Sequence, residues 1–223
     1  MKPLKIDILT LFPEAFSALN SSILKRAQES GKIEINLINI RDFSKDKHSK
    51  CDDYPYGGGA GMLMTPQPIY DAVKSVKKRN SHIVFASPSG QKLTPEIAQR
   101  LSKEKHLVFI CGHYEGIDER ILDLFKPEEI SIGDYVLTGG ELPTMVIIDC
   151  LARFVDGIIT EDSLSEESFS NGLLEYPQYT RPQVFKGLSV PDVLVSGNHQ
   201  EVAKWRKAES EKRTRERRAD LLK

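Results

Sequence analysis

The sequence has little cysteine and no long hydrophobic run. Three cysteines among 223 residues, Cys51, Cys111 and Cys150, are too few and too scattered for a disulfide framework, and no Cys-x-x-Cys pair suggests zinc. We interpret them as free thiols in a reducing compartment and expect a cytoplasmic protein. No apolar run approaches the roughly 20 residues of a membrane span, and the start of the chain lacks a secretory signal pattern. We therefore expect no membrane partner.

The chain also has almost no net charge. Its formal value of −1 does not by itself indicate a nucleic-acid partner. The distribution is uneven, because residues 204–223 contain nine Lys or Arg and four Asp or Glu, a local balance of +5 that leaves −6 for the rest. This basic segment is compatible with phosphate binding, although charge alone favours a solvated helix with internal ion pairs.

Sequence motifs for metals, nucleotide phosphates and serine hydrolases are missing. The histidines show no i,i+4 pairing, so we predict no metal site. Ser87 lies in Ser-Pro-Ser-Gly and not in Gly-x-Ser-x-Gly, which argues against a hydrolase. The glycine-rich string at residues 56–61 fits neither phosphate-binding pattern and is more typical of a mobile or tight turn with positive φ angles.

Strand-like and helix-like segments alternate through the first two thirds of the chain. Apolar runs predict strands over residues 5–12, 33–40, 83–86 and 107–111, and a strand followed by a turn over residues 130–137. Helical spacing predicts helices over residues 14–29, 68–78, 118–125 and 143–155, with a further helix start at 94–96 and a loop over 42–61. This order predicts an α/β fold with a mostly parallel sheet, and a ligand site beyond the carboxyl ends of its strands.

Composition divides the chain into three parts. Residues 1–156 form the predicted globular domain. Residues 157–172 are rich in Glu, Asp and Ser, which is typical of a flexible linker or of a loop that orders on binding. Residues 173–223 begin with an irregular, proline-rich stretch, after which Asn198 and Glu201 resemble a capping box for a helix that ends near Arg218. A small, mainly helical C-terminal domain is therefore expected.

Three loops at the ends of predicted strands are the best candidates for a ligand site. They comprise residues 87–90, 112–116 and 133–140, and each contains glycine or proline, so that its backbone can approach a flat ligand. Aromatic or apolar side chains accompany them: Phe85, Tyr114, Tyr135 and Leu137. These features suit an adenosine moiety held by backbone groups, and Glu115 and Asp134 favour a nearby positive charge. Turns needed only for packing are the alternative.

Six strings spread in order over nearly the whole chain carry a family resemblance. They are Leu11–Glu14, Asp52–Gly59, Cys111–Arg120, Ser131–Pro143, Gly172–Leu174 and Tyr179–Pro182. They closely resemble the bacterial tRNA (guanine-N1)-methyltransferase family of the SPOUT superfamily. The resemblance implies a trefoil-knotted α/β domain, a homodimer, and methylation of N1 of guanosine 37 in tRNA by S-adenosylmethionine, next to the anticodon.

The resemblance also implies the binding residues. By matching position, the cofactor-binding residues are Phe85, Ala86, Ser87, Pro88, Gly112, Tyr114, Glu115, Gly116, Ile132, Gly133, Asp134, Tyr135, Val136, Leu137, Gly139 and Gly140. The linker and C-terminal domain are expected to receive the tRNA through Ser168, Arg181, Lys204, Lys207 and Arg215. The active site is expected to be shared between subunits, and Mg²⁺ is expected as a loosely held activator without a dedicated protein site.

Methylation at N1 requires two further groups. N1 carries a proton near neutral pH, so a general base must remove it, and a fixed cation must stabilise the charge that develops at O6. The resemblance assigns the second role to Arg153, whose alternative role is that of a cation at a helix end. Where the family has Asp before Ser-Phe, this chain has Glu167, and we predict Glu167 as the base. Its competitors are Glu166, Asp162 and Glu175.

Two other functions stay open on the sequence alone. The change from Asp to Glu at position 167 is compatible with an RNA-binding protein that has lost its chemistry. A related knotted enzyme that acts on ribosomal RNA is the other alternative. Cofactor binding without a methylated product would support the inactive RNA-binding protein. Identification of the modified base would test the alternative that acts on ribosomal RNA.

Overall fold

A computed structural model of the chain describes residues 2–160 and 166–222. The chain divides into two compact units, an N-terminal unit of residues 1–159 and a C-terminal unit of residues 160–223. Among the described residues, no helix is long and apolar enough to cross a bilayer.

The N-terminal unit is built on one five-stranded sheet. Its strands run in the order β2-β1-β6-β5-β7, and every neighbouring pair is parallel. The bounds are β1 Leu4–Thr10, β2 Ile33–Asn39, β5 His82–Lys92, β6 His106–Ile110 and β7 Glu128–Ser131. The predicted α/β class with a mostly parallel sheet is confirmed.

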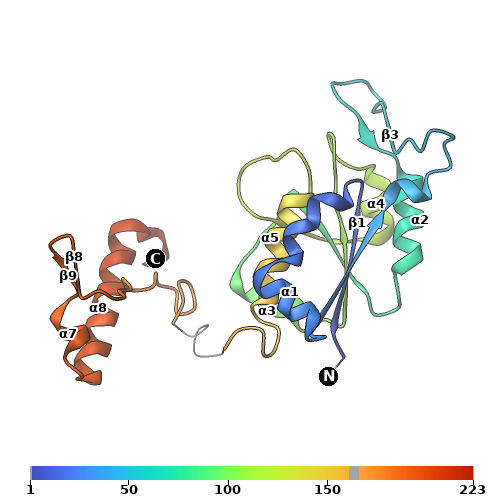
Figure 1. Ribbon diagram of the computed structural model, residues 1–223. Helices are drawn as coiled ribbons and strands as arrows, with labels where there is room; N and C mark the ends of the chain where they lie inside the picture. The colour runs from blue at the N-terminus through green and yellow to red at the C-terminus, as the bar shows by residue number, and fades with distance from the viewer. Residues whose placement is uncertain (1, 161–165, 223) are drawn as a thin grey trace. The chain divides into compact units, whose positions relative to one another are not determined.

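Helices cover both faces of this sheet (Figure 1). One face carries the 3-10 helix η1 (Pro13–Asn20) with α1 (Ser22–Glu29), α3 (Pro95–Ser102) and α5 (Glu141–Ala152). The other carries η2 (Ile40–Phe43), α2 (Pro66–Val76) and α4 (Glu119–Phe125). Because strand side chains alternate, Leu107 and Phe109 of β6 enter the first core while Val108 and Ile110 enter the second.

The single helix predicted over residues 14–29 is wrong. The structure divides it into η1 and α1, and Ser22, the first residue of α1, has a φ of 48°. The Ser21 hydroxyl donates to the carbonyl oxygen of Ala18 at 2.7 Å, which is the local competition with helical hydrogen bonding that serine side chains provide.

The segment predicted as a loop over residues 42–61 contains a short strand. Strand β3 (Asp52–Asp53) pairs antiparallel with β4 (Leu63–Met64) and forms a small hairpin. The positive φ angles predicted for its glycine-rich tip are confirmed at Gly57, Gly58, Gly59 and Gly61.

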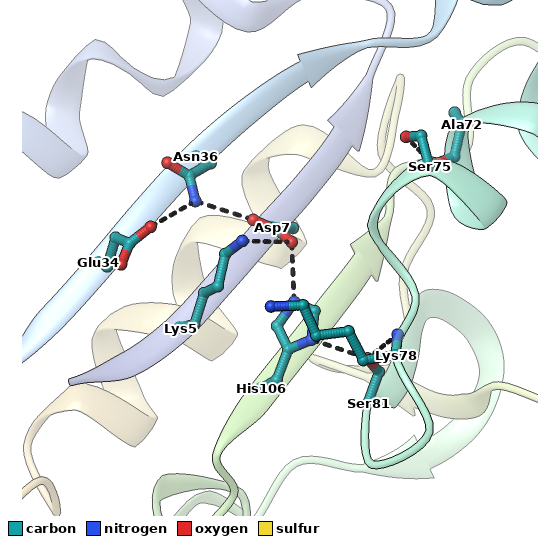
Figure 2. A network of polar contacts seen from close by, with 9 residues as sticks. All are labelled: Lys5, Asp7, Glu34, Asn36, Ala72, Ser75, Lys78, Ser81 and His106. Atoms are coloured by element: carbon teal, nitrogen blue, oxygen red, sulfur yellow. Dashed lines mark hydrogen bonds and ion pairs between the residues drawn. The ribbon is translucent and has the colours of Figure 1, made fainter. Parts of the chain in front are cut away.

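A buried polar network joins three neighbouring strands (Figure 2). The Asp7 carboxylate accepts from Asn36 at 2.9 Å, lies 2.7 Å from Nε2 of His106, and pairs with Lys5 at 3.4 Å. Nδ1 of His106 lies 2.7 Å from Oγ of Ser81, which accepts the backbone N–H of Lys78. The network satisfies a carboxylate that is almost fully buried.

The C-terminal unit is organised around one long helix. It contains the hairpin β8 (Val184–Phe185) and β9 (Leu188–Ser189), α7 (Asp192–Val195), α8 (His199–Arg217) and the 3-10 helix η3 (Ala219–Leu222). The predicted N-cap is confirmed, because Asn198 accepts from the backbone of Gln200 and Glu201. Leu174 binds α8 through its backbone, donating to Thr214 at 2.9 Å and accepting from Ser210 at 2.6 Å.

Candidate functional site

A cavity of about 150 Å³ lies beyond the carboxyl ends of β5, β6 and β7. The three loops predicted from sequence supply most of its wall. Its lining residues are Phe85, Ala86, Ser87, Pro88, Gly112, His113, Tyr114, Glu115, Gly116, Ile130, Ser131, Ile132, Gly133, Tyr135, Val136, Leu137, Gly139 and Pro143. The position agrees with the rule that ligands of parallel sheets bind at the carboxyl ends of strands.

The first loop is an excursion within β5. Ala86 and Gln91 both pair with Ile130 of β7, so the four residues 87–90 leave the sheet and the strand then resumes. A Cβ on Gly90 would stand 2.3 Å from the carbonyl carbon of Glu129, so the return to the sheet requires glycine. The excursion places Ser87 and Pro88 at the cavity wall.

The second and third loops meet backbone to backbone. Gly140, the N-cap of α5, donates to the carbonyl oxygen of Gly112 at 2.7 Å, and His113 bridges to Gly139. A Cβ on Gly140 would lie 2.8 Å from the backbone nitrogen of Gly112 and 3.1 Å from Cα of Cys111. This contact fixes the relative positions of the two loops that carry most of the lining residues.

Substitution of Gly140 by alanine is expected to destabilise the N-terminal unit and deform the cavity. The added methyl group collides with backbone that cannot rotate away, and such overpacking costs about 1–3 kcal/mol. We expect the melting temperature to fall by roughly 2–10 °C for a chain of this size. Thermal denaturation followed by circular dichroism measures the change, and an unaltered melting temperature would show that the two loops are loosely packed.

A histidine–carboxylate pair lies beside the cavity and was not predicted. Glu141 is buried, its Oε1 accepts from the Thr10 hydroxyl at 3.0 Å, and its Oε2 lies 3.7 Å from Nδ1 of His113. That nitrogen is buried and has no hydrogen-bond partner among the described residues. The His113 ring packs on Phe12 at 4.6 Å and against the edge of Tyr114 at 4.9 Å. Contacts over such sequence separations have no local signature in the sequence.

Most residues predicted to bind the cofactor line this cavity. The exceptions are Asp134, an exposed carboxylate that pairs with Lys92 at 2.9 Å, and Gly140, which lies behind the wall. Four lining residues were not predicted individually: His113, Ile130, Ser131 and Pro143. All four lie within or next to the predicted loops. The lining is a geometric finding, and the binding roles of these residues stay predictions.

The two predicted catalytic residues belong to different units. Arg153 is the half-buried C-cap of α5, at the opposite end of that helix from Gly140. Glu167 lies half-buried in a turn of the C-terminal unit, where its carbonyl oxygen accepts from the Ser170 hydroxyl at 2.7 Å.

The competitors for the base differ in their surroundings. The Glu166 carboxylate accepts from the Tyr176 hydroxyl at 2.5 Å and pairs with Arg206 at 3.3 Å. Burial, followed by the hydrogen bond to Glu166, raises the pKa of Tyr176 to about 12. Glu175 accepts from Gln178 at 2.5 Å. Asp162 lies outside the described residues.

The predicted tRNA-binding residues all lie in the C-terminal unit. Lys204, Lys207 and Arg215 are exposed on α8, where Lys204 pairs with Glu201 at 2.9 Å and Lys207 with Glu211 at 4.0 Å. Arg181 is exposed, whereas the Ser168 hydroxyl accepts the backbone N–H of Glu175 at 3.0 Å. Among the residues that the structure describes, no cluster of three His, Cys, Asp or Glu side chains is placed to hold a metal ion.

The fold and the cavity define an α/β protein with a candidate small-ligand site at the carboxyl ends of the strands of a parallel sheet. The sequence profile of the family described as tRNA (Guanine-1)-methyltransferase TrmD matches residues 4–223. The chain belongs to this family, and it is therefore an enzyme that methylates guanine in tRNA.

Two curated relatives illustrate the similarity. The chain is 59% identical over 222 residues to the tRNA (guanine-N(1)-)-methyltransferase of Carboxydothermus hydrogenoformans, covering 99% of this chain and 88% of the relative. It is 55% identical over 224 residues to the enzyme of the same name from Ruminiclostridium cellulolyticum, covering 98% of this chain and 96% of the relative. Both alignments extend through the catalytic candidates of both units.

Proposed function

We propose that this enzyme transfers the methyl group of S-adenosylmethionine to N1 of guanosine 37 in tRNA, in the cytoplasm. The observation that carries the proposal is the cavity formed by three strand-end loops in a chain of this family. Its wall is rich in backbone groups and glycine, which suits the adenosine part of the cofactor. Glu115 contributes a carboxylate to the wall that favours the positive sulfonium.

The path of the chain supports a trefoil knot. Strand β7 is at the edge of the sheet, yet α5 begins beside Gly112 and its Glu141 is bonded to Thr10 of β1. The segment between them, residues 132–139, must therefore cross the carboxyl ends of β5 and β6. We infer that this crossing threads the loops there and closes the cofactor cavity.

The position of Arg153 supports a homodimer with shared active sites. Pro143 lines the cavity near the start of α5, and Arg153 follows ten residues later, which corresponds to ~15 Å along the helix axis. A group that stabilises the reacting guanine must be much closer. On the same helix, Leu142 is 56% exposed and Val146 is 46% exposed, which suits an interface between two copies. We infer that Arg153 acts at the cavity of the partner subunit.

The proposed chemistry has one proton transfer and one methyl transfer. The cofactor supplies an electrophilic methyl group. The Glu167 carboxylate takes the N1 proton, N1 forms the bond to the methyl carbon as the bond to sulfur breaks, and the thioether leaves. The Arg153 guanidinium donates to O6, where negative charge accumulates. Glu166 stays a competing candidate for the base, and Tyr176 and Arg206 hold its carboxylate.

The domains divide this work. We assign cofactor binding to residues 1–156 and the connection to residues 157–172. We assign tRNA binding to residues 173–223, through Arg181 and the cations of α8, together with Ser168 of the connecting segment. We also propose Mg²⁺ as an activator that is bound partly by the substrate. A loosely held ion of this kind needs few protein ligands.

Neutralising three of the exposed cations of α8 is expected to weaken tRNA binding. The triple variant carries Lys204→Gln, Lys207→Gln and Arg215→Gln and loses three phosphate contacts. The slope of log affinity against log salt should therefore become less steep by about 2–3. Filter binding over a salt series measures the slope. The matched control is Lys25→Gln on α1, an exposed lysine that pairs with Glu29. An unchanged slope would assign these α8 cations to a solvated helix face.

The function itself is tested with defined tRNA. Purified protein is incubated with S-adenosylmethionine and two transcripts that differ only by G or A at position 37, and the digested nucleosides are analysed by mass spectrometry. We expect 1-methylguanosine from the first transcript only. Equal methylation of both transcripts, or methylation confined to ribosomal RNA fragments, would contradict the assignment to position 37.

A further inference from the structure

The hairpin at residues 52–64 carries two unpacked tyrosines next to the cofactor cavity. Tyr54 is 78% exposed and Tyr56 is 101% exposed, although tyrosine rings usually bury much of their surface. Figure 1 shows β3 and its flanking loops projecting beyond the helices of the N-terminal unit. The chain thus holds two aromatic faces in solvent at the end of a projection.

The base of this hairpin is bonded to the wall of the cavity. The backbone of Glu115 donates to Met62 at 3.0 Å, Met64 donates to Gly116 at 2.9 Å, and Asp118 donates to Met64 at 3.1 Å. A Cβ on Gly61 would lie 2.4 Å from Cγ of Glu115, so the hairpin also packs closely on a lining side chain. The tyrosines therefore project from a support that is fixed to the site.

The reach of the hairpin limits what the tyrosines can contact. Tyr56 precedes Gly61 by five residues, so it lies at most roughly 17 Å from it along the chain. A stacked strand advances about 3.4 Å per nucleotide. The tip therefore reaches only bases within about five nucleotides of a guanine bound near Glu115.

The surroundings favour RNA over a protein partner. The segment leading into β3 carries three exposed lysines, Lys45, Lys47 and Lys50, of which Lys45 pairs with Asp71 at 3.4 Å. Exposed aromatic rings combined with cations are the common arrangement for single-stranded nucleic acid, in which bases stack on the rings and cations follow the phosphates. Because the enzyme acts on tRNA, we assign a single-stranded loop of tRNA as the occupant of the two tyrosines.

We propose that Tyr54 and Tyr56 form a stacking platform for unpaired tRNA bases that flank the guanine to be methylated. The platform positions the substrate and takes no part in the chemistry. It rests on the proposed function, because it requires the target guanine to lie in a single-stranded loop.

The test uses the full-length protein and a tRNA transcript with 2-aminopurine beside the target guanosine. Stacking quenches the fluorescence of this base. We expect wild type to quench it and Tyr54→Leu with Tyr56→Leu to lose the quenching, with affinity lower by about 5- to 150-fold per lost stacked base. Tyr54→Phe with Tyr56→Phe keeps the ring faces and should behave as wild type. The matched control is Tyr70→Leu, whose ring packs on Phe125 of α4 instead of projecting.

The readouts separate this platform from other roles. Loss of stacking should leave the salt slope of tRNA binding and the affinity for S-adenosylmethionine unchanged, because neither phosphate contacts nor the cavity are altered. Weaker cofactor binding in the leucine variants would instead make the hairpin a cover for the cavity, and normal tRNA affinity and quenching would refute the platform. If the wild-type protein does not methylate guanosine 37 but still quenches the fluorescence, and the leucine variants do not, the proposed function is refuted and the stacking platform is supported.

Discussion

Replacement of Arg153 by alanine is expected to lower kcat by about 10²–10³-fold while the enzyme still binds its cofactor. The loss corresponds to removal of one preorganised donor from a site where negative charge develops. Arg153 does not line the cavity of its own chain, so cofactor affinity measured by calorimetry should be unchanged. Arg153→Lys keeps the charge but loses the fixed pair of donors, and should recover only part of the rate.

The control for Arg153 is another cation at a helix end. Arg26 is exposed in the last turn of α1, and Arg26→Ala removes a charge that favours the helix dipole. If Arg153 served only its own helix, both variants would lose up to about 1 kcal/mol of stability and keep their turnover. Single-turnover rates on tRNA together with thermal denaturation distinguish the two roles.

Replacement of Glu167 by glutamine is expected to lower kcat by about 10²–10⁴-fold, because the variant cannot accept the N1 proton. Raising the pH should restore part of the rate, since more of the guanine then loses this proton to solvent. Glu167→Asp retains a carboxylate on a side chain that is shorter by about 1.5 Å, and should keep more activity than the glutamine variant.

Glu166→Gln is the matched control for this base. It alters the adjacent carboxylate, which is held by Tyr176 and Arg206, and should change the stability of the C-terminal unit more than the chemical step. Near-normal turnover by Glu167→Gln with bound cofactor would assign the base to another residue. A large loss of kcat in Glu166→Gln alone would move the assignment to the neighbouring position.

The sequence predicted the elements that have strong local patterns. Buried strands such as β6 appear as apolar runs, and the start of α8 appears as an Asn198 cap that the structure confirms. The two-residue strands β3 and β4 were missed because they are too short to show alternation. The break at Ser22 was missed because the apolar spacing continues across it, whereas the conformation is decided by local backbone geometry.

The candidate site was predictable only where glycine and proline mark strand ends. The wall of the cavity follows those positions closely. The contact between His113 and Glu141 was not predictable, because it depends on bringing Gly112 and Gly140 together across the sheet. The return of β5 to the sheet at Gln91 likewise depends on its partner Ile130 and on the close approach of Gly90 to the backbone of Glu129.

The buried network around Asp7 makes the free energy of local opening uneven across the sheet. It joins β1, β2 and β6, which are consecutive in the sheet, whereas the ladder between β5 and β7 is interrupted by the excursion at 87–90. Local opening needs little free energy where ladder bonds are interrupted, and most where strands are buried and cross-linked. We therefore expect the ladder beside the cavity to open at a lower free energy than the three joined strands. The network and the interrupted ladder thus lie in different strand pairs of the same sheet, and β6 lies between them.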